Sequence, residues 1–98
     1  MDVSQHQLES MTAALRQMGA TKVLLFGSFA AFPATARDVD VAVEGIPLDR
    51  LLEADVAVHE ILQVPTDLMS KEENVEFFEM IQESSRTRYE QAATGSGN

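Results

Sequence analysis

The chain contains no cysteine, which excludes disulfide bonds, thiolate metal sites and cysteine nucleophiles. A cysteine-free chain fits a reducing compartment, and we expect a cytoplasmic protein. The N-terminus lacks the charged-then-apolar pattern of a signal peptide, and no apolar run approaches the roughly 20 residues of a membrane span. We therefore expect no association with a membrane.

Basic residues are also scarce. The chain has 7 Lys and Arg against 16 Asp and Glu, which gives a formal net charge of −9. Binding to a nucleic-acid backbone depends on Lys and Arg that displace counterions, and here only Arg86 and Arg88 lie close together. We therefore expect no direct nucleic-acid binding. The excess of carboxylates suits a divalent cation, a basic partner protein or simple solubility.

The length of 98 residues corresponds to one domain with a single core. Apolar positions at helical spacing follow Ser4 and Gln7, which have the spacing of a capping box. We predict one domain over residues 1–91 and a disordered tail over residues 92–98. In its first half we predict a helix at 4–18, a buried strand at 21–26, a short helix within 28–36 and an alternating strand at 38–44.

In the second half, Pro47 can begin a helix that runs to about Leu62. A short strand follows at 64–69, where Pro65 favours the edge of a sheet. Ser70 and Glu73 repeat the capping-box spacing and predict a last helix that runs to about Tyr89. The order helix, strand, short helix, strand, helix, strand, helix predicts an α/β fold: a small mixed three-stranded sheet with flanking helices.

Two aspartates are candidates for metal binding. Asp38 and Asp40 stand two residues apart on a predicted strand, so both point to the same face, roughly 7 Å apart. Carboxylates held this close repel each other unless a cation lies between them, and Mg²⁺ prefers such oxygen ligands. Asp67 lies on the next predicted strand. If the two strands are neighbours, three carboxylates converge, which is enough for a site with two metal ions.

Gly27-Ser28 follows the first predicted strand and is a candidate phosphate site. Glycine permits close approach of a ligand to the backbone, and Ser adds a hydroxyl at the start of a helix. Each signal is weak alone, because Gly-Ser also suits a plain turn and an exposed Asp also suits a solvated strand end. Their order and their positions at strand ends make the combination more specific.

The run Leu25-Phe26-Gly27-Ser28-Phe29-Ala30, followed by Asp38-Val39-Asp40-Val41-Ala42-Val43, resembles the minimal nucleotidyltransferases of the DNA polymerase beta superfamily. That family carries Gly-Ser, a spacer of about ten residues and then Asp-x-Asp. Val64-Pro65-Thr66-Asp67-Leu68 is similar to the family's strand with the third carboxylate. The family's closing helix carries residues similar to Ile81, Glu83, Tyr89 and Glu90.

The resemblance implies a nucleotidyltransferase (polymerase beta-like) fold and a role for each motif residue. Gly27 and Ser28 would contact the triphosphate of ATP or another nucleoside triphosphate. Asp38, Asp40 and Asp67 would be the catalytic residues and would bind two Mg²⁺ ions, with Asp67 helping to activate the attacking hydroxyl. The reaction would transfer a nucleoside monophosphate and release pyrophosphate.

Two positions depart from the family pattern. The family commonly has Arg where this chain has Ala31, which removes one cation that could neutralise the triphosphate. The residue before Asp-x-Asp, often Ser, is Arg37, which could bind the nucleotide and supply that charge from another direction.

Three functions therefore stay open. Stand-alone members of the family are antitoxins paired with a small helical HEPN-domain toxin, so the first is an enzyme that adenylylates a hydroxyl of that partner. The second is a catalytically degenerate antitoxin that neutralises its partner by forming a complex. The third is a nucleotide- or metal-sensing domain. The apolar helix faces also leave a homodimer open.

Overall fold

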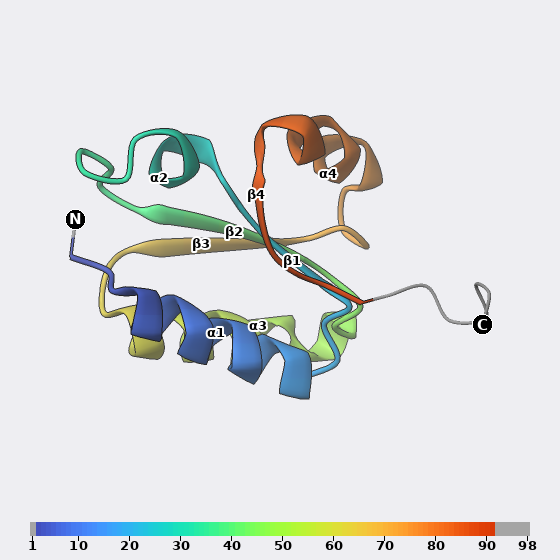
Figure 1. The fold of residues 1–98 in the computed structure, drawn as a ribbon. Helices are drawn as coiled ribbons and strands as arrows, with labels where there is room; N and C mark the ends of the chain where they lie inside the picture. The colour runs from blue at the N-terminus through green and yellow to red at the C-terminus, as the bar shows by residue number, and fades with distance from the viewer. Residues whose placement is uncertain (1, 92–98) are drawn as a thin grey trace.

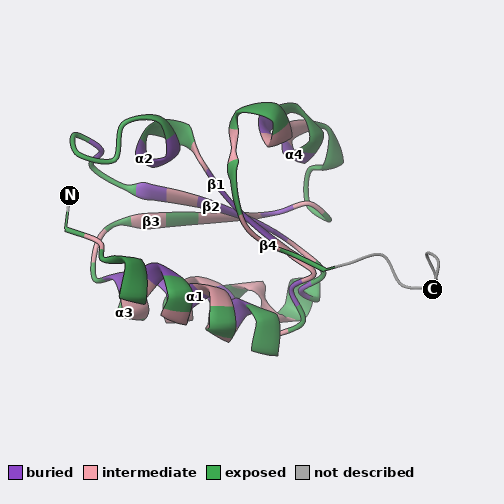
Figure 2. Ribbon diagram, in the orientation of Figure 1, coloured by how far each residue is buried: buried purple, intermediate pink, exposed green. Residues whose placement is uncertain are grey.

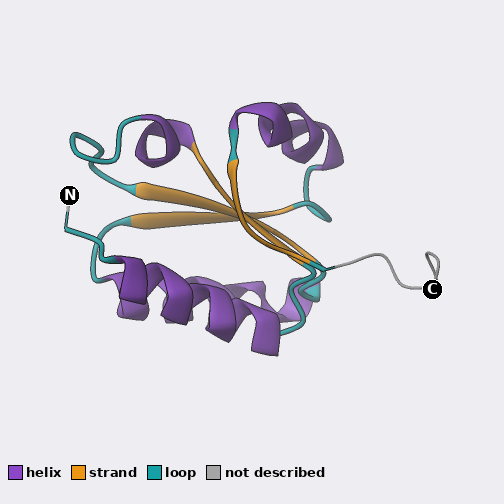
Figure 3. Ribbon diagram, viewed as in Figure 1, coloured by secondary structure: helices purple, strands orange, loops and turns teal. Residues whose placement is uncertain are grey.

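The computed structural model describes residues 2–91, so the tail predicted at 92–98 lies outside the described residues. Helices and strands alternate along the chain (Figures 1 and 3). In order they are α1 (Gln5–Gln17), β1 (Lys22–Phe26), α2 (Gly27–Ala31), β2 (Val39–Glu44), the 3-10 helix η1 (Leu48–Arg50), α3 (Leu51–Leu62), β3 (Thr66–Ser70), α4 (Val75–Ile81), the 3-10 helix η2 (Gln82–Ser84) and β4 (Arg86–Glu90). No helix within this range is long and apolar enough to cross a membrane.

One mixed sheet forms the centre of the fold, with the strand order β3-β2-β1-β4. β1 pairs antiparallel with β2 and with β4, whereas β2 and β3 are parallel. A parallel pair needs a crossover between its strands, and α3 supplies it. α1 and α3 lie side by side below the sheet in Figure 1, while α2 and α4 lie above it.

The two faces of the sheet bury separate apolar clusters. Val39, Val41 and Val43 of β2 alternate toward α1 and α3, as the sequence predicted, and all three are fully buried. On the other face, Ala42 and Leu24 pack under Phe78 and Ile81 of α4. Buried segments accordingly lie where the sheet meets the helices in Figure 2.

The capping box predicted at the start of α1 is confirmed. The Gln7 backbone N–H donates to Ser4 Oγ (3.0 Å), and the Ser4 backbone N–H donates to Gln7 Oε1 (2.8 Å). The Gln7 side chain does more than cap its own helix. Its Nε2 also donates to the carbonyls of Ile61 and Leu62 at 3.2 Å each, which links the start of α1 to the end of α3.

The prediction of the last helix, from Ser70 to about Tyr89, is wrong at both ends. Ser70 does not cap it. Its buried hydroxyl accepts from the Glu72 N–H and donates to Glu72 Oε1, and α4 begins only at Val75, after the cap Asn74. After one further 3-10 turn the chain enters β4, so the sheet has four strands instead of the three predicted.

β4 contains Tyr89 and Glu90, which the family resemblance had placed on a closing helix. None of its five residues is fully buried, so the strand carries little of the apolar alternation that marks a strand in sequence. It forms because β1 would otherwise expose the hydrogen-bonding groups of its free edge.

Candidate active site

The sheet brings the predicted motifs together at one end. β1 stops at Phe26, whose pairing partner on β2 is Asp40. Asp40 in turn pairs in register with Asp67 on the parallel strand β3. Gly27-Ser28 continues directly from β1 into α2. Three segments that are separated in sequence therefore meet around Asp40.

Both strand carboxylates point to the same face of the sheet. Residues two apart on a strand share a face, so Asp40 lies on the same face as Ala42, and Asp67 on the same face as Met69. Ala42 and Met69 both belong to the cluster under α4. Asp38 lies directly before β2 and is exposed. The backbone thus places Asp40 and Asp67 on the same side of the sheet, and Asp38 directly precedes the strand that carries Asp40.

Asp40 sits at the electrostatic centre of this group. Burial raises the pKa of Asp40 above its ordinary value of 3.8, and the neighbouring charges of Asp38 and then Asp67 raise it further. Each cause disfavours the ionised form of Asp40 in the absence of a compensating cation. A positive ion bound among the three carboxylates would remove the repulsion.

Gly27 is required by the position of Asp40. Its φ of +71° lies in the left-handed region, which a residue with a Cβ adopts at a cost. A Cβ at this position would overlap Asp40 Oδ2 and would lie 3.1 Å from Asp40 Cγ. The carboxylate therefore occupies the space that any side chain at Gly27 would need.

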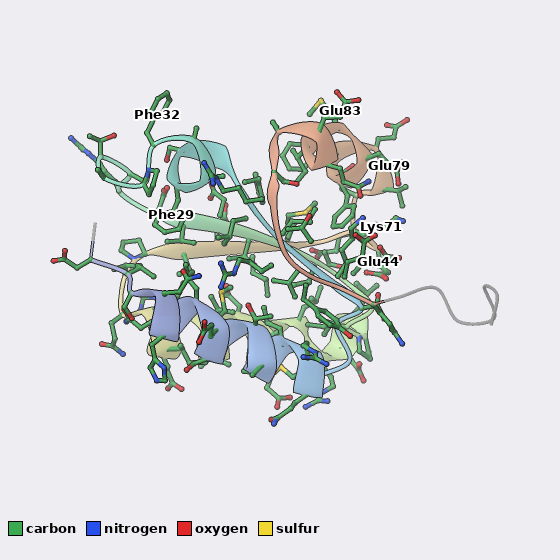
Figure 4. The ribbon with its side chains drawn as sticks, viewed as in Figure 1. Phe29, Phe32, Glu44, Lys71, Glu79 and Glu83 are labelled. Carbon is green, nitrogen blue, oxygen red and sulfur yellow. The ribbon has the colours of Figure 1, made fainter. Side chains whose placement is uncertain are left out.

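The short helix α2 holds Gly27-Ser28 at this strand end. Phe29 is 7% exposed and belongs to the core, whereas Phe32, just after the helix, is 70% exposed. Figure 4 shows Phe32 pointing away from the body of the protein and Phe29 on the sheet side of α2. Anchoring through Phe29 leaves Gly27 and Ser28 exposed, where a ligand can reach them.

Two arginines lie beside the motif residues: Arg37 directly precedes Asp38, and Arg86 contacts α2. Ala31 is exposed, and Arg37 is exposed in the loop before Asp38, with no ion pair to any residue of the described range 2–91. The second of these arginines, Arg86, was not predicted from the sequence. Arg86 Nε of β4 donates to the Ala30 carbonyl (2.7 Å), which places a guanidinium against α2 beside Ala31. No local signal reveals this contact, because the two residues are 56 positions apart.

The donor set suits a hard divalent cation in its chemistry, because all three side chains offer carboxylate oxygens. The side chains as they lie do not yet form a ligand set: across residues 2–91 no group of three or more His, Cys, Asp or Glu is arranged to hold a metal ion. The backbone brings the carboxylates to one place, and side-chain rotation would have to complete the coordination.

Comparison with known proteins supports the fold. No family model and no curated protein matches the sequence. The structure is similar to a chain in the crystal structure of a mutant MntA–HpeT toxin–antitoxin complex, with a TM-score of 0.71 and 13% sequence identity. The match covers 92% of this chain and 75% of that chain. This likeness confirms the predicted nucleotidyltransferase-like α/β fold, with a fourth strand added.

Proposed function

We propose that this chain is a metal-dependent nucleotidyltransferase of the antitoxin type, which transfers AMP from ATP to a hydroxyl of a partner toxin. One observation carries the proposal: Asp40 lies in register with Asp67 and occupies the space beside Gly27 that only a glycine leaves open. The likeness in fold to a chain of a toxin–antitoxin complex supports it.

Each motif residue has a role in this proposal. Asp38, Asp40 and Asp67 would hold two Mg²⁺ ions, which when bound stabilise charge on the attacking and leaving oxygens. The exposed Gly27-Ser28 would contact the triphosphate through the backbone and the Ser28 hydroxyl. Arg37 would supply positive charge beside the phosphates.

The transfer balances as an in-line displacement. The oxygen of the acceptor hydroxyl forms a bond to the α-phosphorus, while the bond from that phosphorus to the bridging oxygen of the β-phosphate breaks. Pyrophosphate leaves with the electron pair, and Asp67 would receive the proton of the hydroxyl. Asp67 is exposed on the edge strand β3, so an acceptor on another protein can reach it. By the family resemblance the acceptor is a hydroxyl, of Tyr, on a helical HEPN-domain toxin.

A second candidate is an antitoxin that acts by complex formation alone. It is favoured by the cation missing at Ala31 and by the carboxylates that do not form a ligand set as they lie. In that case the carboxylates would be remnants of a site, and the interface with the partner would account for neutralisation.

Label transfer separates the two candidates. The chain is incubated with Mg²⁺, labelled ATP and its co-expressed partner, alongside Asp38→Asn, Asp40→Asn and the control Asp49→Asn, an exposed acid on η1. We expect Mg²⁺-dependent labelling of the partner by the unmutated chain and by Asp49→Asn only. An absence of labelling by the unmutated chain would contradict the proposed transferase activity. Neutralisation by both site variants would support the second candidate.

A further inference from the structure

A recess lies on the α1 side of the sheet, away from the carboxylates. It has a volume of about 520 Å³ and opens between the start of α1, β1, α2 and β4. Leu8, Leu25 and Phe29 form part of its wall, and all three belong to the core cluster on the face opposite Asp40 and Ala42. A volume of this size falls within the roughly 300–1,000 Å³ typical of small-molecule sites.

The remaining wall carries two arginines from β4. Arg86 and Arg88 both line the recess, and neither forms an ion pair with any carboxylate in residues 2–91. This is unexpected in a chain with 16 Asp and Glu. The positive charge of the recess is therefore not neutralised by the protein itself.

Arg88 also contains an unsatisfied donor. Its Nε is buried, and no acceptor among the described residues bonds to it. Buried side-chain donors in proteins nearly always have a partner, so an orphaned one needs an explanation. The strand is irregular at this residue: Thr87 pairs with Leu24 and Tyr89 with Val23, which leaves Arg88 as the extra residue of a bulge. Bulges commonly redirect a side chain toward a binding site.

We propose that this recess binds a small amphipathic oxyanion, a carboxylate or phosphate ester that carries an apolar group. The guanidinium groups would bind the oxyanion, since their planar donor fork matches two oxygens of a carboxylate or phosphate. Leu8, Leu25 and Phe29 would cover the apolar group. A neutral apolar molecule would leave the Arg88 donor unpaired, and free phosphate would leave the apolar wall uncovered.

Titration of the full chain with defined probes tests the proposal. The probes are 3-phenylpropionate, phenyl phosphate, the neutral 3-phenylpropanamide and inorganic phosphate, without Mg²⁺ or nucleotide, followed by amide chemical shifts. We expect saturable shifts at Phe29, Thr87 and Arg88 with at least one of the two amphipathic oxyanions, and the two titrations show which oxyanion is preferred. The amide and inorganic phosphate should bind at least tenfold more weakly.

Variants then assign the binding to the arginine fork. Arg88→Gln should weaken binding at least tenfold, while Arg50→Gln, which removes the same charge on η1, should leave it unchanged. Asp40→Asn should also bind normally, so failure here is distinguishable from failure of the proposed transferase. Arg88→Lys keeps the charge without the fork and replaces Arg88→Gln if that variant does not fold.

Three outcomes would overturn the proposal. The first is equal binding of the amide and the carboxylate. The second is equal binding of inorganic phosphate and phenyl phosphate, together with no tighter binding of 3-phenylpropionate than of inorganic phosphate. The third is undiminished binding by the folded Arg88 variant, or a loss in Arg50→Gln as large as in the Arg88 variant.

Discussion

Substitution of Gly27 by Ala should damage both stability and the carboxylate site. The left-handed φ of +71° costs a residue with a Cβ roughly 1–2 kcal/mol. The new Cβ also overlaps Asp40 Oδ2, and displacing that partly buried carboxylate adds about 1 kcal/mol. We expect a loss of about 2–3 kcal/mol in the free energy of unfolding. For a domain of this size that lowers the melting temperature by roughly 10–20 °C.

A double-mutant cycle separates the two contributions. Urea unfolding followed by circular dichroism is measured for the unmutated chain, Gly27→Ala, Asp40→Ala and the double variant. In the Asp40→Ala background the overlap is absent, so Gly27→Ala should cost only the backbone strain, and the coupling should be about 1 kcal/mol. A coupling near zero would refute the argument that Asp40 is the reason for glycine at this position.

Four further predictions follow from individual contacts. Burial and two like charges raise the pKa of Asp40 in the folded state above 3.8, so the folded state binds the proton more tightly than the unfolded state. Asp40 therefore lowers stability as the pH rises from its ordinary pKa through its raised folded pKa. In thermal melts Asp40→Asn should be more stable than the unmutated chain at pH 7, and the difference should vanish below about pH 4. Excess Mg²⁺ should raise the melting temperature of the unmutated chain and leave that of Asp40→Asn unchanged, and equal shifts would contradict a site at Asp40. Gln7→Ala should cost roughly 1–2 kcal/mol and more than Ser4→Ala, because Gln7 also bonds two carbonyls of α3; urea melts that rank the two variants the other way would contradict that link. Phe78→Ala should cost about 3–5 kcal/mol in the same melts, since Phe78 of α4 is fully buried against the sheet, and a loss below about 1 kcal/mol would show that α4 is not packed as described.

The sequence by itself determined the elements whose signals are local. Ser4 and Gln7 cap α1 because both partners lie within one helical turn. The alternation of Val39, Val41 and Val43 specifies a strand with one buried face whatever its neighbours are. Gly27-Ser28 and the two aspartates around Val39 could be recognised as a motif because each pair is contiguous or nearly so.

The tertiary structure decided what depends on distant partners. The segment at β4 has little apolar alternation of its own, which is why a helix was predicted there. It becomes a strand because the edge of β1 is open beside it. The Arg86 bond to the Ala30 carbonyl and the bulge at Arg88 likewise exist only once β4 has docked.

The candidate site shows the same division. Its residue types were visible in the sequence, but the register of Asp40 with Asp67 depends on parallel pairing through a crossover helix. The need for glycine at Gly27 depends on where the Asp40 carboxylate lies, 13 residues further along the chain. Local periodicity carries no information on either distance, because backbone pairing between remote segments sets both.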